Sequence, residues 1–416
     1  MHIKDFSLSA LVAGFLAVFI SFAGPVAIVF QAARLAGLSN ELTSSWIWAI
    51  GMGSGSAGLL LSYRLKMPII AAWSTPGAAL LVVSLPTIGI HQAVGAYIVA
   101  ALLVLALGLS GAFQTLIRHI PKGIVAAMLA GVLFNFGVQA FVAIQSSPAL
   151  VLCVLLAFLL GKRLAPRYAT ALAVALGAAL VLGRGDNHLA QVALSVARPV
   201  FIAPEWSWHA ALSVGFPLAL VTLTGQHMPG LAVLKASGYE APARLLVSLN
   251  GCVSLLFACF GAHAINPSVI AASICTGSEA HEDPARRYVA GLAAGVFYIV
   301  IAVFGATLAQ LMAALPKELI MTLSGLALIG SITTGLVGMV SHAEHRDASI
   351  ITFLVAASGM SLLGLGAAFW SLVLGGVAYL ILHQRWGVRY DAPDPGIVLP
   401  IETETDNARP DPIVCN

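Results

Sequence analysis

The chain has 416 residues, of which 59% are apolar and only 9% are charged. An ordinary soluble domain is roughly 45–50% apolar and about 25% charged, so this composition excludes a soluble enzyme. The 20 basic and 17 acidic side chains leave a net charge of +3, too small a balance for a surface that binds nucleic acid. We therefore interpret the chain as an all-α polytopic membrane protein.

Taking about twenty apolar residues as one crossing of the membrane, we count about fourteen transmembrane segments. They are 8–36, 44–63, 68–86, 92–116, 121–143, 147–162, 168–183, 209–236, 241–262, 264–280, 287–313, 317–340, 348–364 and 366–384. The first run is longer than the apolar part of a signal peptide, so we expect it to stay as a helix. The five cysteines have no metal-ligand spacing, and we assign neither a metal nor a disulfide.

The distribution of basic residues predicts the orientation of the chain. With the N-terminus in the cytoplasm, all but four of the 20 Lys and Arg residues fall on the cytoplasmic side. The four that fall outside are Arg34, Arg184, Arg198 and Lys317. This asymmetry follows the positive-inside rule and predicts that both termini face the cytoplasm. We expect the protein in the cytoplasmic (inner) membrane of a bacterium.

Three pairs of short motifs recur in the same order in the two halves of the chain. The pairs are Gly24-Pro-Val-Ala with Met228-Pro-Gly-Leu, Ser74-Thr-Pro-Gly-Ala with Ile265-Asn-Pro-Ser-Val, and Ile120-Pro-Lys-Gly with Leu315-Pro-Lys-Glu. The prolines of these pairs lie 204, 191 and 195 residues apart. The near-constant spacing predicts that the fourteen transmembrane segments form two repeats of seven, a 7+7 repeat. Because seven is odd, the second half must be inverted in the membrane, as in many secondary transporters.

Segments three and ten each carry a polar residue followed by proline within an apolar run. Thr75-Pro76 and Asn266-Pro267 have the form of an N-cap with proline at the first helical position. We therefore expect each segment to be broken into a short extended strand and a half-helix. The N-termini of two such half-helices would converge on one point and favour an anion there. The alternative is that each proline only kinks a continuous helix.

Segment eight carries Gln226 and His227 directly before Pro229 and Gly230, where the helix should bend. Polar side chains at membrane depth are costly and face the interior of the bundle. Histidine also changes its charge near neutral pH, so His227 is the candidate for a transported proton. The alternative is a structural histidine with satisfied hydrogen bonds.

The run from Thr224 to Lys235 and the run that starts at Trp73 resemble the benzoate:proton symporter (benzoate permease) family. The broken third and tenth segments are similar to the nucleobase/ascorbate transporter fold, which includes the uracil permease. That group carries N-x-G-x-x-x-x-T in segment ten, where this chain has Asn266, Ser268 and Ser273. The Glu that the group carries three residues before a Gly in segment eight is His227 in this chain.

The missing carboxylate agrees with an anionic substrate, because benzoate is itself a carboxylate and a fixed Glu would repel it. The resemblance implies proton-coupled uptake of benzoate or a similar aromatic carboxylate, with the proton as coupling ion and no other cofactor. Helix N-termini and hydroxyls would bind the carboxylate, aromatic rings would face the substrate ring, and His227 would carry the proton. The candidate substrate-binding residues are Phe22, Trp73, Ser74, Thr75, Gln226, His227, Asn266 and Ser268.

The resemblance also implies a division of the chain into a core that carries the site and a gate that supports its movement. The core comprises 1–120 and 209–314, the gate comprises 121–208 and 315–386, and 387–416 would be a disordered cytoplasmic tail. The expected partners are the bilayer, the small aromatic carboxylate and a second copy of the chain, with no nucleic acid.

Other functions stay open from the sequence. The same fold serves nucleobase and inorganic-anion carriers, and the missing Glu argues against the nucleobase alone. An anion channel would conduct without accumulating its substrate. A membrane enzyme is disfavoured because the sequence offers no pair of carboxylates, Cys–His arrangement or phosphate-binding loop at one depth.

Overall fold

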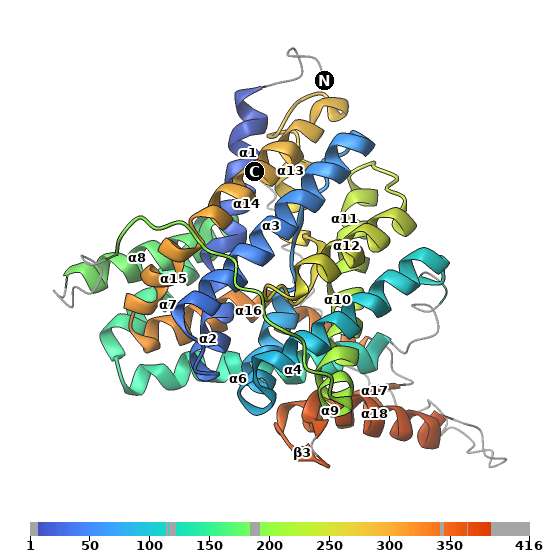
Figure 1. Ribbon diagram of the computed structural model, residues 1–416. Coiled ribbons are helices and arrows are strands. Elements are labelled where there is room, and N and C mark those ends of the chain that lie inside the picture. The colour runs from blue at the N-terminus through green and yellow to red at the C-terminus, as the bar shows by residue number, and fades with distance from the viewer. Residues whose placement is uncertain are drawn as a thin grey trace, which may run out of the picture.

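The computed structural model describes residues 7–113, 115, 122–183, 192–341, 345–363 and 365–383. These residues form a helical bundle with two very small sheets, which confirms the all-α membrane fold (Figure 1). The predicted tail at 387–416 lies outside the described residues.

The elements of the first half precede residue 192. They are α1 (Leu8–Ala23), α2 (Pro25–Leu35), α3 (Asn40–Leu65), β1 (Ala71–Trp73), α4 (Thr75–Ser110), α6 (Lys122–Val142), η2 (Ala143–Gln145), α7 (Pro148–Leu164), η3 (Pro166–Tyr168) and α8 (Ala169–Gly183).

The elements of the second half follow in the same general order. They are α9 (Trp208–Ala210), η5 (Ala211–Gly215), α10 (Phe216–Thr222), η6 (Leu223–His227), α11 (Met228–Ala236), α12 (Ala243–Ala258), β2 (Ile265–Pro267), α13 (Val269–Cys275), η7 (Pro284–Arg286), α14 (Tyr288–Val303), α15 (Gly305–Ala314), α16 (Lys317–Val340), α17 (Arg346–Ala357), β3 (Ser361–Leu362), β4 (Leu365–Gly366) and α18 (Ala367–His383).

Six helical stretches of the described chain are long and apolar enough to cross a membrane. They are Leu8–Leu35, Thr75–Ser110, Lys122–Gln145, Trp208–Ala236, Pro284–Val303 and Lys317–Val340. The half-helix of predicted segment three and most of predicted segment four lie in one stretch, α4, which is interrupted at Gly89 with a φ of 76°. Glycine accepts this left-handed conformation without a steric penalty, so the chain can turn there. The total of fourteen crossings stays a prediction.

Helices α6 and α16 pack against each other along their length and run in opposite directions. Gly325, near the start of α16, lies against Phe136 and Ala140, near the end of α6. Gly335, near the end of α16, lies against Ala126 and Ala130, near the start of α6. Small residues let the two backbones approach closely, which is how helices associate in membranes.

An extended segment at 192–207 crosses the bundle between α8 and α9 (green in Figure 1). Its backbone amides donate to four different parts of the protein. Ser195 donates to Thr307 Oγ1 (2.8 Å), and Val200 donates to Ser45 Oγ (2.9 Å). Farther along, Ile202 donates to the carbonyl of Cys259 (2.7 Å) and Glu205 to that of His91 (3.0 Å). The segment therefore ties α15, α3, α12 and α4 together.

We predict that Gly325→Leu separates α16 from α6. A Cβ atom at this position would lie 2.6 Å from Phe136 O and 2.6 Å from the Ala140 Cβ, so backbone must move. Overpacking of this kind costs about 1–3 kcal/mol. Thermal stability in detergent, followed by fluorescence size-exclusion chromatography, should fall. Gly330→Ala on the same helix is the control, because a Cβ there meets nothing within 4 Å. Equal stability of the two variants would contradict the packing.

Candidate functional site

Strands β1 and β2 cross at the centre of the bundle and pair antiparallel, with Ala72 opposite Asn266. The amide that follows each strand donates to the other segment. Ser74 N donates to Ala264 O (3.1 Å), and Ser268 N donates to Ile70 O (2.8 Å). The two donors, Ser74 and Ser268, are 194 positions apart, and so are the two acceptors, Ile70 and Ala264. The crossing is therefore two-fold symmetric, as the inverted repeat requires.

The predicted N-caps of the two half-helices were wrong by one and two residues. Ser74, not Thr75, caps α4, because its Oγ accepts from Gly77 N (3.1 Å). Ser268, not Asn266, caps α13, because its Oγ accepts from Ala271 N (3.3 Å). A serine hydroxyl is short enough to reach the third helical amide, and it took that place in both halves.

The two prolines consequently differ in their surroundings. Pro76 lies in the first turn of α4, whereas Pro267 lies in β2 opposite Ala71. Ser74 and Ser268, 194 residues apart, are therefore the equivalent positions of the two halves. Pro76 and Pro267, 191 residues apart, are not equivalent, so the alignment on these prolines was wrong by three residues. The prediction of a short strand followed by a half-helix in each half is confirmed.

Segment eight is a helix whose winding changes twice. The turns η5 and η6 are π-helical, and η6 contains both Gln226 and His227. Single π-turns occur frequently at functional sites. Thr222, just before η6, donates from its Oγ1 to Ser74 Oγ (3.1 Å). The π-turn is thereby attached to the start of α4.

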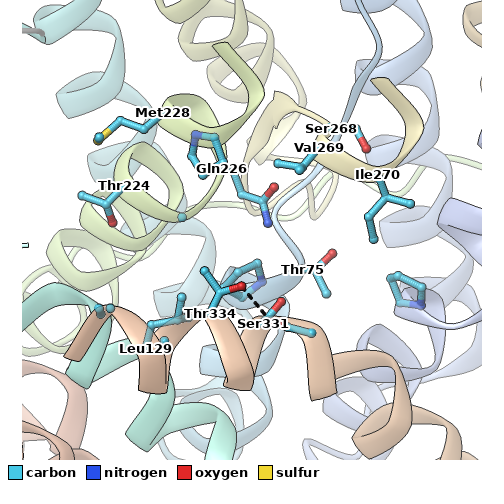
Figure 2. Close-up of a pocket in the computed structure, with 18 of the residues that line it drawn as sticks. Thr75, Leu129, Thr224, Gln226, Met228, Ser268, Val269, Ile270, Ser331 and Thr334 are labelled. Carbon is cyan, nitrogen blue, oxygen red and sulfur yellow. Dashed lines mark hydrogen bonds between the residues drawn. The ribbon is translucent and has the colours of Figure 1, made fainter. Parts of the chain in front are cut away.

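A cavity of about 510 Å³ lies beside the crossing strands. Its walls come from the α1–α2 junction, β1, the start of α4, η6 with α11, Ser268 with the start of α13, and one face each of α6 and α16. Figure 2 shows Gln226 and Thr75 pointing toward each other across it, with Ser331 and Thr334 on α16 below them. The lining is mostly apolar, with a few converging polar groups, which is the usual make-up of a site for a small organic molecule.

The electrostatics of this cavity favour a negative charge. None of the described residues that line it is an Asp or Glu, and its one charged side chain is Lys122. The first-turn amides of Thr75, Val269 and Ile270, which all line the cavity, have no acceptor within their own helices. Amide and hydroxyl donors of this kind bind oxygen atoms of an anion.

The structure brings four of the eight predicted site residues to the cavity wall: Trp73, Thr75, Gln226 and Ser268. The other four lie behind the wall. Phe22 packs edge-on against Trp73, with ring centroids 4.6 Å apart, and Ser74 is taken up by the cap of α4. Asn266 is fully buried in β2, where its Nδ2 donates to Pro267 O (3.2 Å).

The fourth of these residues, His227, is fully buried and does not line the cavity. Its Nδ1 lies 3.1 Å from Thr222 O, and since a carbonyl only accepts, Nδ1 carries the hydrogen. Its Nε2 has no hydrogen-bond partner among the described residues. The ring lies edge-on to Phe113, with centroids 6.4 Å apart. The free Nε2 is therefore the position at which this side chain could take up a proton.

The candidate residues taken from the sequence leave out the wall that α16 contributes to the cavity. Ala327, Ser331, Thr334 and Gly338 line the cavity at spacings of four, three and four residues, and so share one helix face, with Gly330 beside them. Small and hydroxyl-bearing residues at this spacing in an apolar helix were the available signal. The same pattern is typical of a face that packs against another helix. Only the tertiary structure shows that this face lines a cavity.

His263, outside the predicted set, connects three elements beneath the cavity. Its Nδ1 accepts from Trp46 Nε1 on α3 (3.1 Å), because an indole nitrogen can only donate. Its Nε2 therefore carries the hydrogen and donates to the Ser74 carbonyl (2.9 Å). The two hydrogen bonds therefore fix His263 in one neutral tautomer, with the hydrogen on Nε2. His263 holds the strand before α4 against α3 and the segment that leads into β2.

Comparison with known proteins gives one family. The family model described as "Benzoate membrane transport protein" matches residues 4–381. The chain is 44% identical to the benzoate membrane transport protein of Acinetobacter baylyi, over 91% of this chain and 96% of that protein. It is 41% identical to the inner membrane protein YdcO of Escherichia coli, over 90% of this chain and 95% of that protein.

Solved structures with the same fold are much more distant in sequence. The structure of SLC26A9 has a TM-score of 0.60 at 15% identity, and the match covers 92% of this chain and 66% of that one. The transmembrane domain of the cyanobacterial bicarbonate transporter BicA has a TM-score of 0.57 at 15% identity, covering 92% of this chain and 98% of that one. The chain therefore has the inverted-repeat fold of membrane transporters.

We predict that His263→Gln keeps the stability of the protein and that His263→Phe lowers it. A glutamine amide can accept from Trp46 through its oxygen and donate to Ser74 through its nitrogen. Phenylalanine can do neither and leaves the buried indole unpaired, at a cost of about 1–3 kcal/mol. Thermal stability and transport by the two variants check this. A stable, active His263→Phe variant would contradict the role of the two hydrogen bonds.

Proposed function

The chain belongs to the family of benzoate membrane transport proteins, and from this premise we propose that it carries benzoate or a similar aromatic carboxylate into the cell together with a proton. The observation that carries the proposal is the cavity beside the crossing strands. Its described lining offers amides, hydroxyls and one ammonium group, and no carboxylate. A neutral amide, Gln226, stands at the centre of the polar groups (Figure 2).

In this proposal the substrate carboxylate faces the start of α4. Thr75, Gln226 and Ser268 supply hydrogen bonds to its oxygens, and the backbone amides at the start of the two half-helices add to them. The apolar remainder of the wall then contacts the ring. Trp73 is the aromatic side chain in that wall, and Phe22 holds it in place from behind.

In the proposed alternating access, the two sides of the cavity move against each other. One side is α6 and α16, in the proposed gate at 121–208 and 315–386. The other side belongs to the proposed core at 1–120 and 209–314, which carries the crossing strands. Movement of the core against the gate would close the cavity on one face of the membrane and open it on the other. Homodimerisation and cytoplasmic termini complete the proposal.

A second candidate is an inorganic anion, because the fold is shared with a bicarbonate transporter. The resemblance of the broken segments three and ten to the nucleobase/ascorbate transporter fold keeps a nucleobase as a further candidate. The apolar wall favours the aromatic carboxylate over the inorganic anion, which gains nothing from apolar contacts, and the missing Glu argues against the nucleobase.

The function is tested by uptake of labelled benzoate into proteoliposomes with an inward proton gradient. We expect transient accumulation that unlabelled benzoate competes away and that a protonophore abolishes. Neutral benzoic acid crosses lipid unaided, so protein-free vesicles are run in parallel. Competition by uracil, sulfate or bicarbonate would move the assignment to another substrate of the same fold. Conductance without accumulation would indicate a channel.

We predict that Gln226→Glu weakens benzoate binding by about tenfold or more. A fixed carboxylate within a few ångströms of the substrate carboxylate repels it, and the low dielectric of the cavity strengthens that repulsion. Gln226→Asn keeps a neutral amide and is the control for a change of shape. Binding to the detergent-purified protein is measured by titration calorimetry. Unchanged affinity in Gln226→Glu would place the substrate carboxylate elsewhere.

We predict that His227→Gln keeps the exchange of labelled for unlabelled benzoate and loses accumulation driven by a pH gradient. Exchange needs only binding and movement of the carrier, whereas accumulation needs the proton that the free Nε2 of His227 would take up. His209→Gln, at an exposed histidine on α9, is the matched control. Accumulation by His227→Gln at the wild-type level would remove His227 from proton coupling.

A further inference from the structure

Lys122 lines the cavity at one end of α6. Val125, Ala126 and Leu129 continue the same helix face into the cavity, and Leu129 lies seven residues, or about 10 Å, farther along the axis. The Lys122 side chain is exposed, and no described acidic group lies within ion-pair distance of it. An ammonium group therefore stands where the cavity begins, in a wall that is otherwise uncharged.

The inverted repeat gives Lys122 a counterpart. Lys317 follows Pro316 as Lys122 follows Pro121, and the two lysines are 195 residues apart. Helices α6 and α16 begin at these lysines and pack in opposite directions. Because α16 has 24 residues, about 36 Å at 1.5 Å per residue, the two lysines lie on opposite faces of the molecule.

The two faces differ in this conformation. Beside Lys122 the cavity separates α6 from α11, whereas α2 packs directly against α16 and Gly24 approaches Ala327. Lys317 lines no part of the cavity. Ser324, which corresponds to Leu129 in the other half, is fully buried with a hydroxyl that has no described partner. The region beside Lys317 is thus packed where its equivalent beside Lys122 is open, and it holds a buried hydroxyl, that of Ser324, with no partner among the described residues.

The position of Lys317 also departs from the general charge pattern of the chain. In the predicted orientation it is one of four basic residues on the outer face, so the positive-inside rule does not account for it. Its side chain is exposed and therefore accessible to a solute at that face, with Glu318 as the neighbouring residue in the first turn of α16.

We propose that Lys122 and Lys317 are a symmetry-related pair of entrance cations, each of which draws small anions into the cavity from its own side of the membrane. The anions are carboxylates if the proposed function holds, on which this inference rests for its substrate. A charge at the mouth of a cleft with low-dielectric walls raises the local concentration of the opposite charge, and salt screens the effect. The pair would act on the approach of the substrate and not on its bound state.

The experiment measures initial rates of benzoate transport at low substrate from each face of vesicles of defined sidedness. We expect Lys122→Gln to lower the rate from its own face by about three- to tenfold in about 10 mM salt, where screening is weak. The rate from the opposite face should stay unchanged, and the loss should disappear in about 1 M salt. Lys317→Gln should show the mirror image.

Two controls separate charge from structure. Lys122→Arg keeps the charge and should keep the rate. Lys162→Gln removes an exposed lysine of α7, outside the cavity, and should have no effect. The proposal is overturned if Lys122→Gln behaves like Lys162→Gln at low salt, or if it lowers transport equally from both faces.

A second readout does not depend on benzoate. Ala126→Cys and Met321→Cys each place a thiol one helical turn after a lysine, in a chain whose native cysteines are replaced by alanine. The rate of reaction with an anionic thiosulfonate reagent is compared with that of a cationic one. Lys122→Gln should lower the ratio of the anionic to the cationic reaction rate severalfold for the thiol at position 126, and should leave the ratio at position 321 unchanged. Lys317→Gln should lower the ratio at position 321 and leave that at position 126 unchanged. If wild-type protein moves no benzoate, the proposed function fails, and unchanged ratios would then overturn the lysine pair as well.

Discussion

The pairing of two three-residue strands at the centre of the bundle is the constraint on which the rest of the structure depends. Backbone that is neither helical nor paired is very costly where water is excluded, so two broken helices in one membrane protein must satisfy each other. Here β1 and β2 do so symmetrically, and the amides of Ser74 and Ser268 complete the pairing on either side. Two helices can then begin inside the bundle.

Several side chains stabilise this crossing from the elements around it. Thr222 reaches Ser74 from the π-turn, and His263 connects the Ser74 carbonyl to Trp46 on α3. These contacts join segments three, eight and ten of the predicted count into one unit with α3. A substrate bound at the start of α4 would be held by this unit as a whole, which is what transport by movement of a rigid core requires.

The cavity owes its chemistry to what is absent from its described lining as much as to what is present. A carboxylate in place of Gln226 would repel an anion in this space, whereas the neutral amide does not. A few polar groups, among them Thr75, Gln226 and Ser331, converge on a cavity whose lining is otherwise mostly apolar, and this combination suits a molecule with one charged end and one apolar end. The same fold can thus serve different substrates through a few side chains.

The sequence by itself determined the membrane class, the family resemblance, the inverted halves and the breaks in segments three and ten, because long apolar runs and repeated proline motifs are local signals. Only the tertiary structure decided which residue of each motif caps its helix, and it chose Ser74 and Ser268 over Thr75 and Asn266. It also turned Gln226 toward the cavity and its neighbour His227 away. A one-residue step along a helix rotates a side chain by about 100°, so the winding of a π-turn, which no sequence pattern fixed, determined which of the two faces the cavity.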